Sequence, residues 1–278
     1  MDSVTNLILP TDKNSSAIAV INAIDNPLLC SKFFLAKKLY KSIPQNVLNS
    51  ECELVLASIG NLGISLAYLL LNDVCKLKVF LPQNVSKSVL VRLKMLNADY
   101  TVVEKLKLKS EVMVAAMNYS VVDDSRVYVD QFELAECALV YTQEIFSRVN
   151  FSDEFREVKL YCPVGTGSIL YATCQFADSL LEGTVVPVVF DSNGDKSQEA
   201  ISRVRYFFPR VCQEEPVNIV VEDAHFMFEM FGTDLVFPPG SFSIYSLRAA
   251  MDAFLKNMNN ETLFVSVVTD TLLSTLSS

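Results

Sequence analysis

Four of the eight glycines in this 278-residue chain lie in two short loops that are suited to holding an anion. The first loop, residues 58–63, follows the apolar run 54–57, and the second, residues 165–168, follows the apolar run 158–162. Each loop precedes a segment with the composition of a helix. Because the first N–H groups of a helix have no partner within it and the helix dipole favours negative charge, we expect a phosphate or carboxylate at one or both loops. Two ordinary tight turns are the alternative.

Lys32 has surroundings that could make its amine a nucleophile, although its position alone favours a solvated lysine. It begins an expected helix over residues 32–41 and has the apolar neighbours Phe33 and Phe34. Burial among such side chains lowers the pKa of a lysine, and a neutral amine can bond covalently to a carbonyl compound. A solvated lysine at a helix start is the alternative. The one histidine, His225, lies in another expected helix start, which excludes a histidine-based triad unless His225 is its base.

The elements that must position these residues alternate between strands and helices, which predicts an α/β fold with parallel sheets covered by helices. Ligands of such sheets bind at the carboxyl ends of the strands, where both glycine loops stand. We place a domain boundary in the polar segment 150–154. The N-terminal domain, 1–149, then carries Lys32 and the Asn61 loop, and the C-terminal domain, 150–278, carries the Gly165 loop. We expect the ligand in a cleft between the two domains.

Composition excludes several classes of protein. Hydrophobic residues make up 51% of the chain and charged residues 20%, which is enough for a large core. The net charge of −9 comes without any basic run longer than Lys37-Lys38, so we expect no nucleic-acid partner. Seven scattered cysteines without a C-x-x-C pair argue against a disulfide framework and a metal site, and favour reduced thiols in the cytoplasm. We find no signal peptide, no membrane span, and neither a dinucleotide fingerprint nor a P-loop.

Three segments together resemble the pyridoxal-phosphate enzymes of the tryptophan-synthase-β fold, especially the cysteine synthases. Residues 26–32 resemble the N-P-x-x-S-x-K segment of that family. Residues 58–63, with the helix that follows, are similar to its T-S-G-N-T-G loop, and residues 164–168 to its G-T-G-G-T phosphate cup. Weaker similarities at 96–100, 130–145, 239–241 and 269–276 follow in the same order, so that the resemblance extends from residue 18 to the end of the chain.

The resemblance implies pyridoxal 5′-phosphate as the cofactor and β-elimination or β-replacement on an amino acid of the serine or O-acetylserine type as the reaction. Lys32 would bond to the cofactor and act as the acid and base at the substrate α-carbon. It also implies a homodimer. The residues that would hold the cofactor are Asn61, Gly165, Thr166, Gly167, Ser168 and Thr269, with Thr269 at the pyridine nitrogen, and those that would bind the substrate are Ser58 and Gln131.

Departures from the family pattern keep two other functions open. Phe33 and Phe34 stand where the family has Asp and Arg, and Cys30 replaces a serine. Ile59 and Leu62 replace polar residues of the substrate loop. One alternative is therefore a catalytically degenerate relative that acts as a regulatory or protein-binding partner. The other is an α/β binding module that does not use pyridoxal phosphate.

Overall fold

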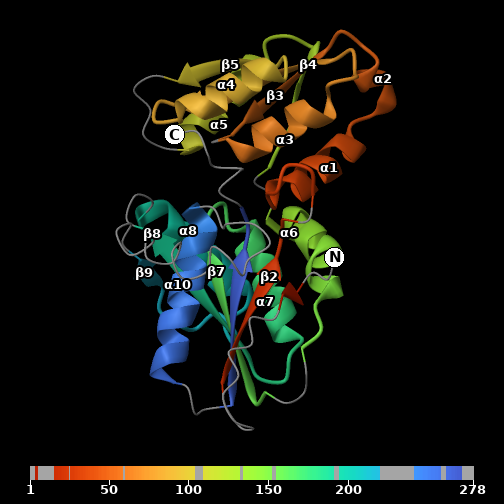
Figure 1. Ribbon diagram of the computed structural model, residues 1–278. Coiled ribbons are helices and arrows are strands. Elements are labelled where there is room, and N and C mark those ends of the chain that lie inside the picture. The colour runs from red at the N-terminus through yellow and green to blue at the C-terminus, as the bar shows by residue number, and fades with distance from the viewer. Residues whose placement is uncertain are drawn as a thin grey trace. The chain divides into compact units, whose positions relative to one another are not determined.

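The chain folds into two compact units, each with a sheet of parallel strands covered by helices (Figure 1). The computed structural model describes residues 4–5, 16–24, 26–58, 60–103, 109–131, 134–151, 155–190, 194–219, 241–257 and 261–270. The described residues of Met1–Ser31 and Leu134–Thr275 form the larger unit, and those of Lys32–Glu133 form the smaller one. This division differs from the expected boundary at residues 149 and 150. An N-terminal strand is built into the sheet of the C-terminal half, and the helix at 134–144 packs on the helix at 168–178.

The larger unit has a six-stranded sheet with the strand order β1-β2-β10-β7-β8-β9. Of the strands that the structure describes in this sheet, β1 alone runs antiparallel to its neighbour. The strands are β1 (Val4–Thr5), β2 (Ala17–Asn22), β7 (Glu157–Pro163), β8 (Gly183–Phe190), β9 (Val217–Ile219) and β10 (Thr262–Val268). The helices are α6 (Leu134–Glu144), η1 (Phe146–Arg148), α7 (Ser168–Asp178), α8 (Gly194–Phe207) and α10 (Ser241–Lys256).

Strand β10 is central to this sheet, and every one of its residues is buried. It pairs in parallel with β2 on one side and with β7 on the other. Helix α10 packs against it, where Leu247 and Phe254 join Ile18 and Phe264 in one hydrophobic core. A parallel strand with neighbours on both edges and a helix above it needs apolar side chains along its length, which explains the near-continuous apolar sequence of β10.

The smaller unit has a four-stranded parallel sheet with the order β5-β4-β3-β6. Helix α5 covers β3, β4 and β6 through a core that contains Val55, Phe80 and Ala116, and helix α1 packs on α3. The strands are β3 (Glu53–Ala57), β4 (Lys76–Pro82), β5 (Asp99–Val103) and β6 (Arg126–Tyr128). The helices are α1 (Lys32–Ser42), α2 (Gln45–Leu48), α3 (Asn61–Leu69), α4 (Lys87–Met95) and α5 (Lys109–Ser120).

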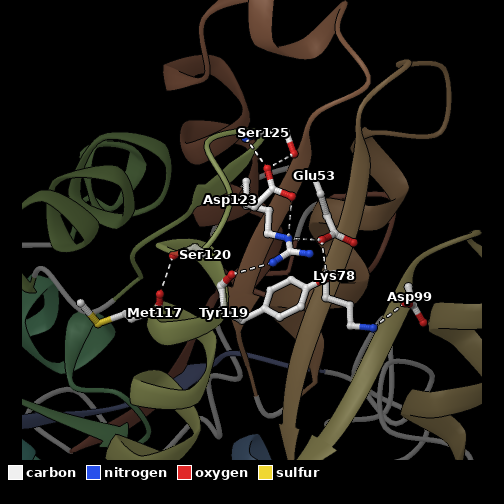
Figure 2. Close-up of polar contacts among 9 residues, drawn as sticks. Glu53, Lys78, Asp99, Met117, Tyr119, Ser120, Asp123 and Ser125 are labelled. Carbon is white, nitrogen blue, oxygen red and sulfur yellow. Dashed lines mark hydrogen bonds and ion pairs between the residues drawn. The ribbon is translucent and has the colours of Figure 1, made fainter.

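A polar cluster joins the amino ends of β3 and β6 in the smaller unit. Glu53 and Arg126 are register partners there. The Tyr119 hydroxyl donates to Glu53 at 2.8 Å (Figure 2), and the Arg126 guanidinium carbon lies 3.8 Å from the centre of the Tyr119 ring. A hydrogen-bonded ring beneath a guanidinium group fixes α5 against the sheet. The cluster lies at the end of β3 opposite to the glycine loop, so its role is structural.

Some expectations lie outside the described residues: the helix at 224–231 with His225, the segment 238–240, the end segment 272–276, and Ile59. Within the described ranges, none of the helices has the length and apolar character that a membrane crossing requires. Among the same residues, no three His, Cys, Asp or Glu side chains come together in a way that would hold a metal ion. All seven cysteines are buried, and none of them forms a disulfide.

Candidate functional site

The loop that leads to Lys32 is organised by the side chain of Asn26. Its Nδ2 donates to the carbonyl of Cys30 at 2.9 Å, and its Oδ1 accepts the N–H groups of Leu28 at 3.2 Å and of Cys30 at 3.4 Å. These bonds close a tight turn in which Leu29 has a φ of 51°. An asparagine side chain that bonds to backbone groups two and four residues ahead fixes a turn in this way, so Asn26 directs the chain into α1.

The end of this loop is attached to the end of β10 in the larger unit. The Ser31 N–H donates to the Thr269 carbonyl at 2.7 Å, and Cys30 forms an isolated antiparallel bridge with Asp270. The side chain of Ser31 shares a hydrogen bond with the hydroxyl of Tyr141 in α6, and burial raises the pKa of that hydroxyl. Ser31 is therefore held through both its backbone and its side chain.

Lys32 follows Ser31 directly and is the first residue of α1. Its side chain is half-buried, and the next four residues of the helix are buried. The ring of Phe33 packs edge-on against Tyr68 of α3, with 6.2 Å between ring centres. Phe33 and Phe34, which depart from the family pattern, are each 8% exposed. Packing on Tyr68 explains an apolar side chain at Phe33, and burial is consistent with one at Phe34.

In the 58–63 loop, the side chain of Ser58 holds the backbone together. Its Oγ accepts the N–H of Gly60 at 3.2 Å and the N–H of Gly63 at 3.3 Å, and its own N–H donates to the Phe80 carbonyl. Gly60 has a φ of 154°, which a residue with a side chain rarely adopts. The loop therefore needs glycine at position 60, and Ser58 is buried as the cap of α3.

Two more candidates lie at the same end of β3. Asn61 is the first residue of α3 and is half-buried. Its amide group makes no hydrogen bond to any other residue that the structure describes. Gln131 is buried, and its Nε2 donates to the carbonyl of Ala57, the last residue of β3. The smaller unit thus brings Ser58, Asn61 and Gln131 together beyond the carboxyl end of this strand.

The second glycine loop lies in the larger unit, between β7 and α7. Gly167 is the N-cap of α7 with a left-handed φ of 94°, and no side chain caps the helix. The hydroxyls of Thr166 and Ser168 are 3.4 Å apart. A Cβ added at Gly165 would meet no atom within 4 Å. The uncapped N–H groups, the two hydroxyls and the open space beside Gly165 suit a phosphate group.

Thr269 lies at the same edge of the larger sheet as this loop, because β10 and β7 are neighbouring parallel strands. The larger unit therefore has two polar features at this edge of its sheet, the donors of residues 165–168 and Thr269. Ser243, whose hydroxyl accepts the N–H of Thr269, and Asp270, whose carboxylate accepts the N–H of Ser243, were not identified from the sequence. The available signal was an acidic residue two positions after an apolar strand.

No family model matches the chain, and no curated protein has a significant match to it. Among solved structures, the chain is similar to a hydrogen sulfide-producing enzyme from Fusobacterium nucleatum, with a TM-score of 0.78 and 17% identity over 97% of this chain and 95% of that one. It is similar to an O-acetylserine dependent cystathionine β-synthase from Helicobacter pylori, with a TM-score of 0.76 and 16% identity over 99% and 92%. The third, O-ureido-L-serine synthase, has a TM-score of 0.76 and 15% identity over 99% and 90%. These matches confirm the tryptophan-synthase-β-like α/β fold.

Proposed function

We propose that the chain is a pyridoxal-phosphate enzyme of the cysteine-synthase type. Its substrate would be an amino acid with a leaving group on Cβ, such as serine or O-acetylserine. One observation carries the proposal: the Ser31 N–H bonds to the Thr269 carbonyl. Lys32, the candidate nucleophile, is therefore next in the chain to Ser31, and Ser31 is hydrogen-bonded to Thr269, the candidate partner of the pyridine nitrogen. The two serine derivatives in the names of similar enzymes support this substrate class.

Different residues of the chain would bind different polar groups of the cofactor. The N–H groups of residues 165–168 and the hydroxyls of Thr166 and Ser168 donate to the phosphate. The amide of Asn61 would donate to the 3-oxygen of the cofactor, and the neutral hydroxyl of Thr269 would be the partner of the pyridine nitrogen. When bound, pyridoxal phosphate supplies a sink for the electron pair that a proton leaves behind.

Lys32 supplies the amine that bonds to the cofactor and moves the proton at the substrate α-carbon. Ser58 and Gln131 shape the substrate side of the site. Both oxygen lone pairs of the Ser58 hydroxyl are used by the N–H groups of Gly60 and Gly63, so the proton of the hydroxyl is what Ser58 offers to a substrate carboxylate.

Burial of the apolar replacements supports an enzyme over a protein-binding relative. Leu62 is 2% exposed, and Phe33 and Phe34 are 8% exposed each. Buried side chains offer little surface to a protein partner. The family's homodimer remains part of the proposal, and light scattering of the purified chain tests it.

Borohydride trapping tests the covalent role of Lys32. The purified chain is mixed with pyridoxal phosphate, reduced, digested and analysed by mass spectrometry. We expect the modification on the peptide that contains Lys32, its loss in Lys32→Ala, and its retention in Lys38→Ala, which changes an exposed lysine of the same helix. A wild-type chain that stays unmodified and colourless contradicts the proposal.

Addition of O-acetylserine to the cofactor-bound chain separates the enzyme from its degenerate alternative. The enzyme shifts the visible absorbance and, with sulfide, forms cysteine. A chain that binds the cofactor at Lys32 but shows no spectral change with serine, O-acetylserine or cysteine would favour the regulatory relative.

A further inference from the structure

The hydroxyl of Ser243, in the first turn of α10, makes a set of hydrogen bonds that fills its capacity. Its oxygen accepts the N–H groups of Thr269 and Asp270, each at 2.9 Å. Its proton has two alternative acceptors, the carbonyl of Asp270 at 2.9 Å and the carboxyl Oδ1 of Asp270 at 2.5 Å. A hydroxyl has two lone pairs and one proton, so Ser243 has nothing left for other partners. The residue is completely buried.

Asp270 in turn accepts a hydrogen bond from the backbone at the start of α10. Its Oδ1 accepts the Ser243 N–H at 3.0 Å, and the residue is 3% exposed. The first N–H groups of a helix need an acceptor, and a carboxyl oxygen from another segment serves as well as a local cap. Ser243 and Asp270 therefore complete each other: the serine satisfies the backbone beyond β10, and the aspartate satisfies the backbone of α10.

These contacts hold Thr269 from both sides. Its N–H is bonded to Ser243, and its carbonyl accepts the Ser31 N–H at 2.7 Å. The next residue, Asp270, pairs with Cys30. Just beyond the end of β10, the serine hydroxyl is the acceptor for the N–H groups of Thr269 and Asp270. The backbone that carries Thr269 and the backbone that precedes Lys32 are thus joined to one buried pair.

We propose that Ser243 and Asp270 are positioning residues that fix Thr269 and the 26–31 loop in a single register at the end of β10. The inference rests on the proposed function, because it assigns Thr269 and Lys32 to the two ends of the same cofactor ring. Neither Ser243 nor Asp270 touches the cofactor. They act by keeping the Thr269 hydroxyl and the start of α1 where the ring requires them.

Hydrogen exchange of the cofactor-free chain tests this role without any activity. Ser243→Ala is compared with Ser246→Ala, which removes a second buried serine of the same helix. Ser246 bonds to the Ser243 carbonyl, to Ser266 Oγ and to the Val267 carbonyl. We expect exchange in peptides covering 26–32 and 266–270 to rise at least tenfold in S243A, and exchange in 26–32 to change less than twofold in S246A. Equal effects of the two variants on 26–32 overturn the proposal.

If S243A does not fold, Asp270→Asn carries the test, because it keeps an oxygen for the Ser243 N–H. We expect a smaller increase of exchange in the same two peptides, and no increase overturns the proposal.

Titration with pyridoxal phosphate adds a spectroscopic readout. We expect S243A to bind the cofactor at least tenfold more weakly and with a shifted emission maximum, and S246A to match the wild type in both. Unchanged affinity and emission in S243A overturn the positioning role. A wild-type chain that does not bind pyridoxal phosphate overturns the proposed function instead, and the exchange result still decides whether the pair fixes the 26–31 loop.

Discussion

The hydroxyl oxygen of Ser58 accepts the N–H of Gly63 at 3.3 Å and so caps α3 from the end of the preceding strand. It also accepts the N–H of Gly60. We predict that Ser58→Ala lowers the free energy of unfolding of the cofactor-free chain by about 1–2 kcal/mol, because two N–H groups lose their acceptor. Urea denaturation measures the change.

Ser86→Ala is the matched control for this prediction. Ser86 is the N-cap of α4, but its side chain makes no capping hydrogen bond. We expect its loss to change the free energy of unfolding by less than about 0.5 kcal/mol. Equal effects of S58A and S86A would show that Ser58 does not stabilise α3.

Asn61→Ala separates binding from stability. Because the Asn61 amide has no hydrogen-bond partner among the described residues, its removal should leave the unfolding free energy within about 0.5 kcal/mol of wild type. The affinity for pyridoxal phosphate should fall about tenfold, which corresponds to one hydrogen bond. An absorbance titration measures the affinity.

Asn26→Ala removes the same type of side chain as Asn61→Ala, but at a position where the amide is hydrogen-bonded. Its amide makes three hydrogen bonds within the 26–31 loop, so we expect a loss of about 1–3 kcal/mol in the unfolding free energy. An N61A variant as unstable as N26A would show that the Asn61 amide is part of the folded framework.

Gly183→Ala should destabilise the larger unit strongly. An added Cβ would overlap the carbonyl group of Ala177, with the carbonyl carbon only 3.0 Å away, and backbone cannot move aside as a side chain can. We expect a loss of about 3 kcal/mol in unfolding free energy. Gly165→Ala, which meets no atom within 4 Å, should leave stability unchanged and weaken cofactor binding if the phosphate occupies that space. Thermal denaturation with and without cofactor distinguishes the two.

The stability of the chain should fall at alkaline pH. Burial, with Cys52 and Asp73 nearby, raises the pKa of the Cys75 thiol to about 11 from an ordinary value of 9.0. The folded chain therefore keeps this thiol protonated where the unfolded chain ionises it. The resulting contribution is complete below pH 9.0 and is lost as the pH rises through about 11. Urea denaturation in reducing buffer should show the decline, and Cys75→Ala should make it shallower; an identical slope in C75A would contradict this assignment.

The position of β2 shows where sequence reasoning about the fold ends. The apolar run near residues 18–24 predicts a strand, and the structure has β2 there. Nothing local specifies its partner. Only the folded chain pairs it with β10, nearly 250 residues later, and this pairing places the N-terminal strand in the larger unit.

The candidate site divides in the same way. The two glycine loops leave a local mark, because glycine pairs follow apolar runs and precede helices. Lys32 and Thr269 are singled out only by the resemblance to a known family, because a helix start or a strand end does not by itself indicate chemistry. The bonds of Ser58 to Gly60 and Gly63 could not be predicted, because the sequence shows a serine in either case, whether its hydroxyl caps a helix or binds a substrate.

By itself the sequence determined the alternation of strands and helices, and the residues able to do chemistry, since both depend on short-range periodicity and side-chain type. Tertiary structure alone decided that Ser31 bonds to Thr269 and that Ser243 and Asp270 satisfy each other. Those contacts join segments between 27 and 238 residues apart, and a hydrogen bond over such a separation depends on how the sheet is assembled, which no local pattern records.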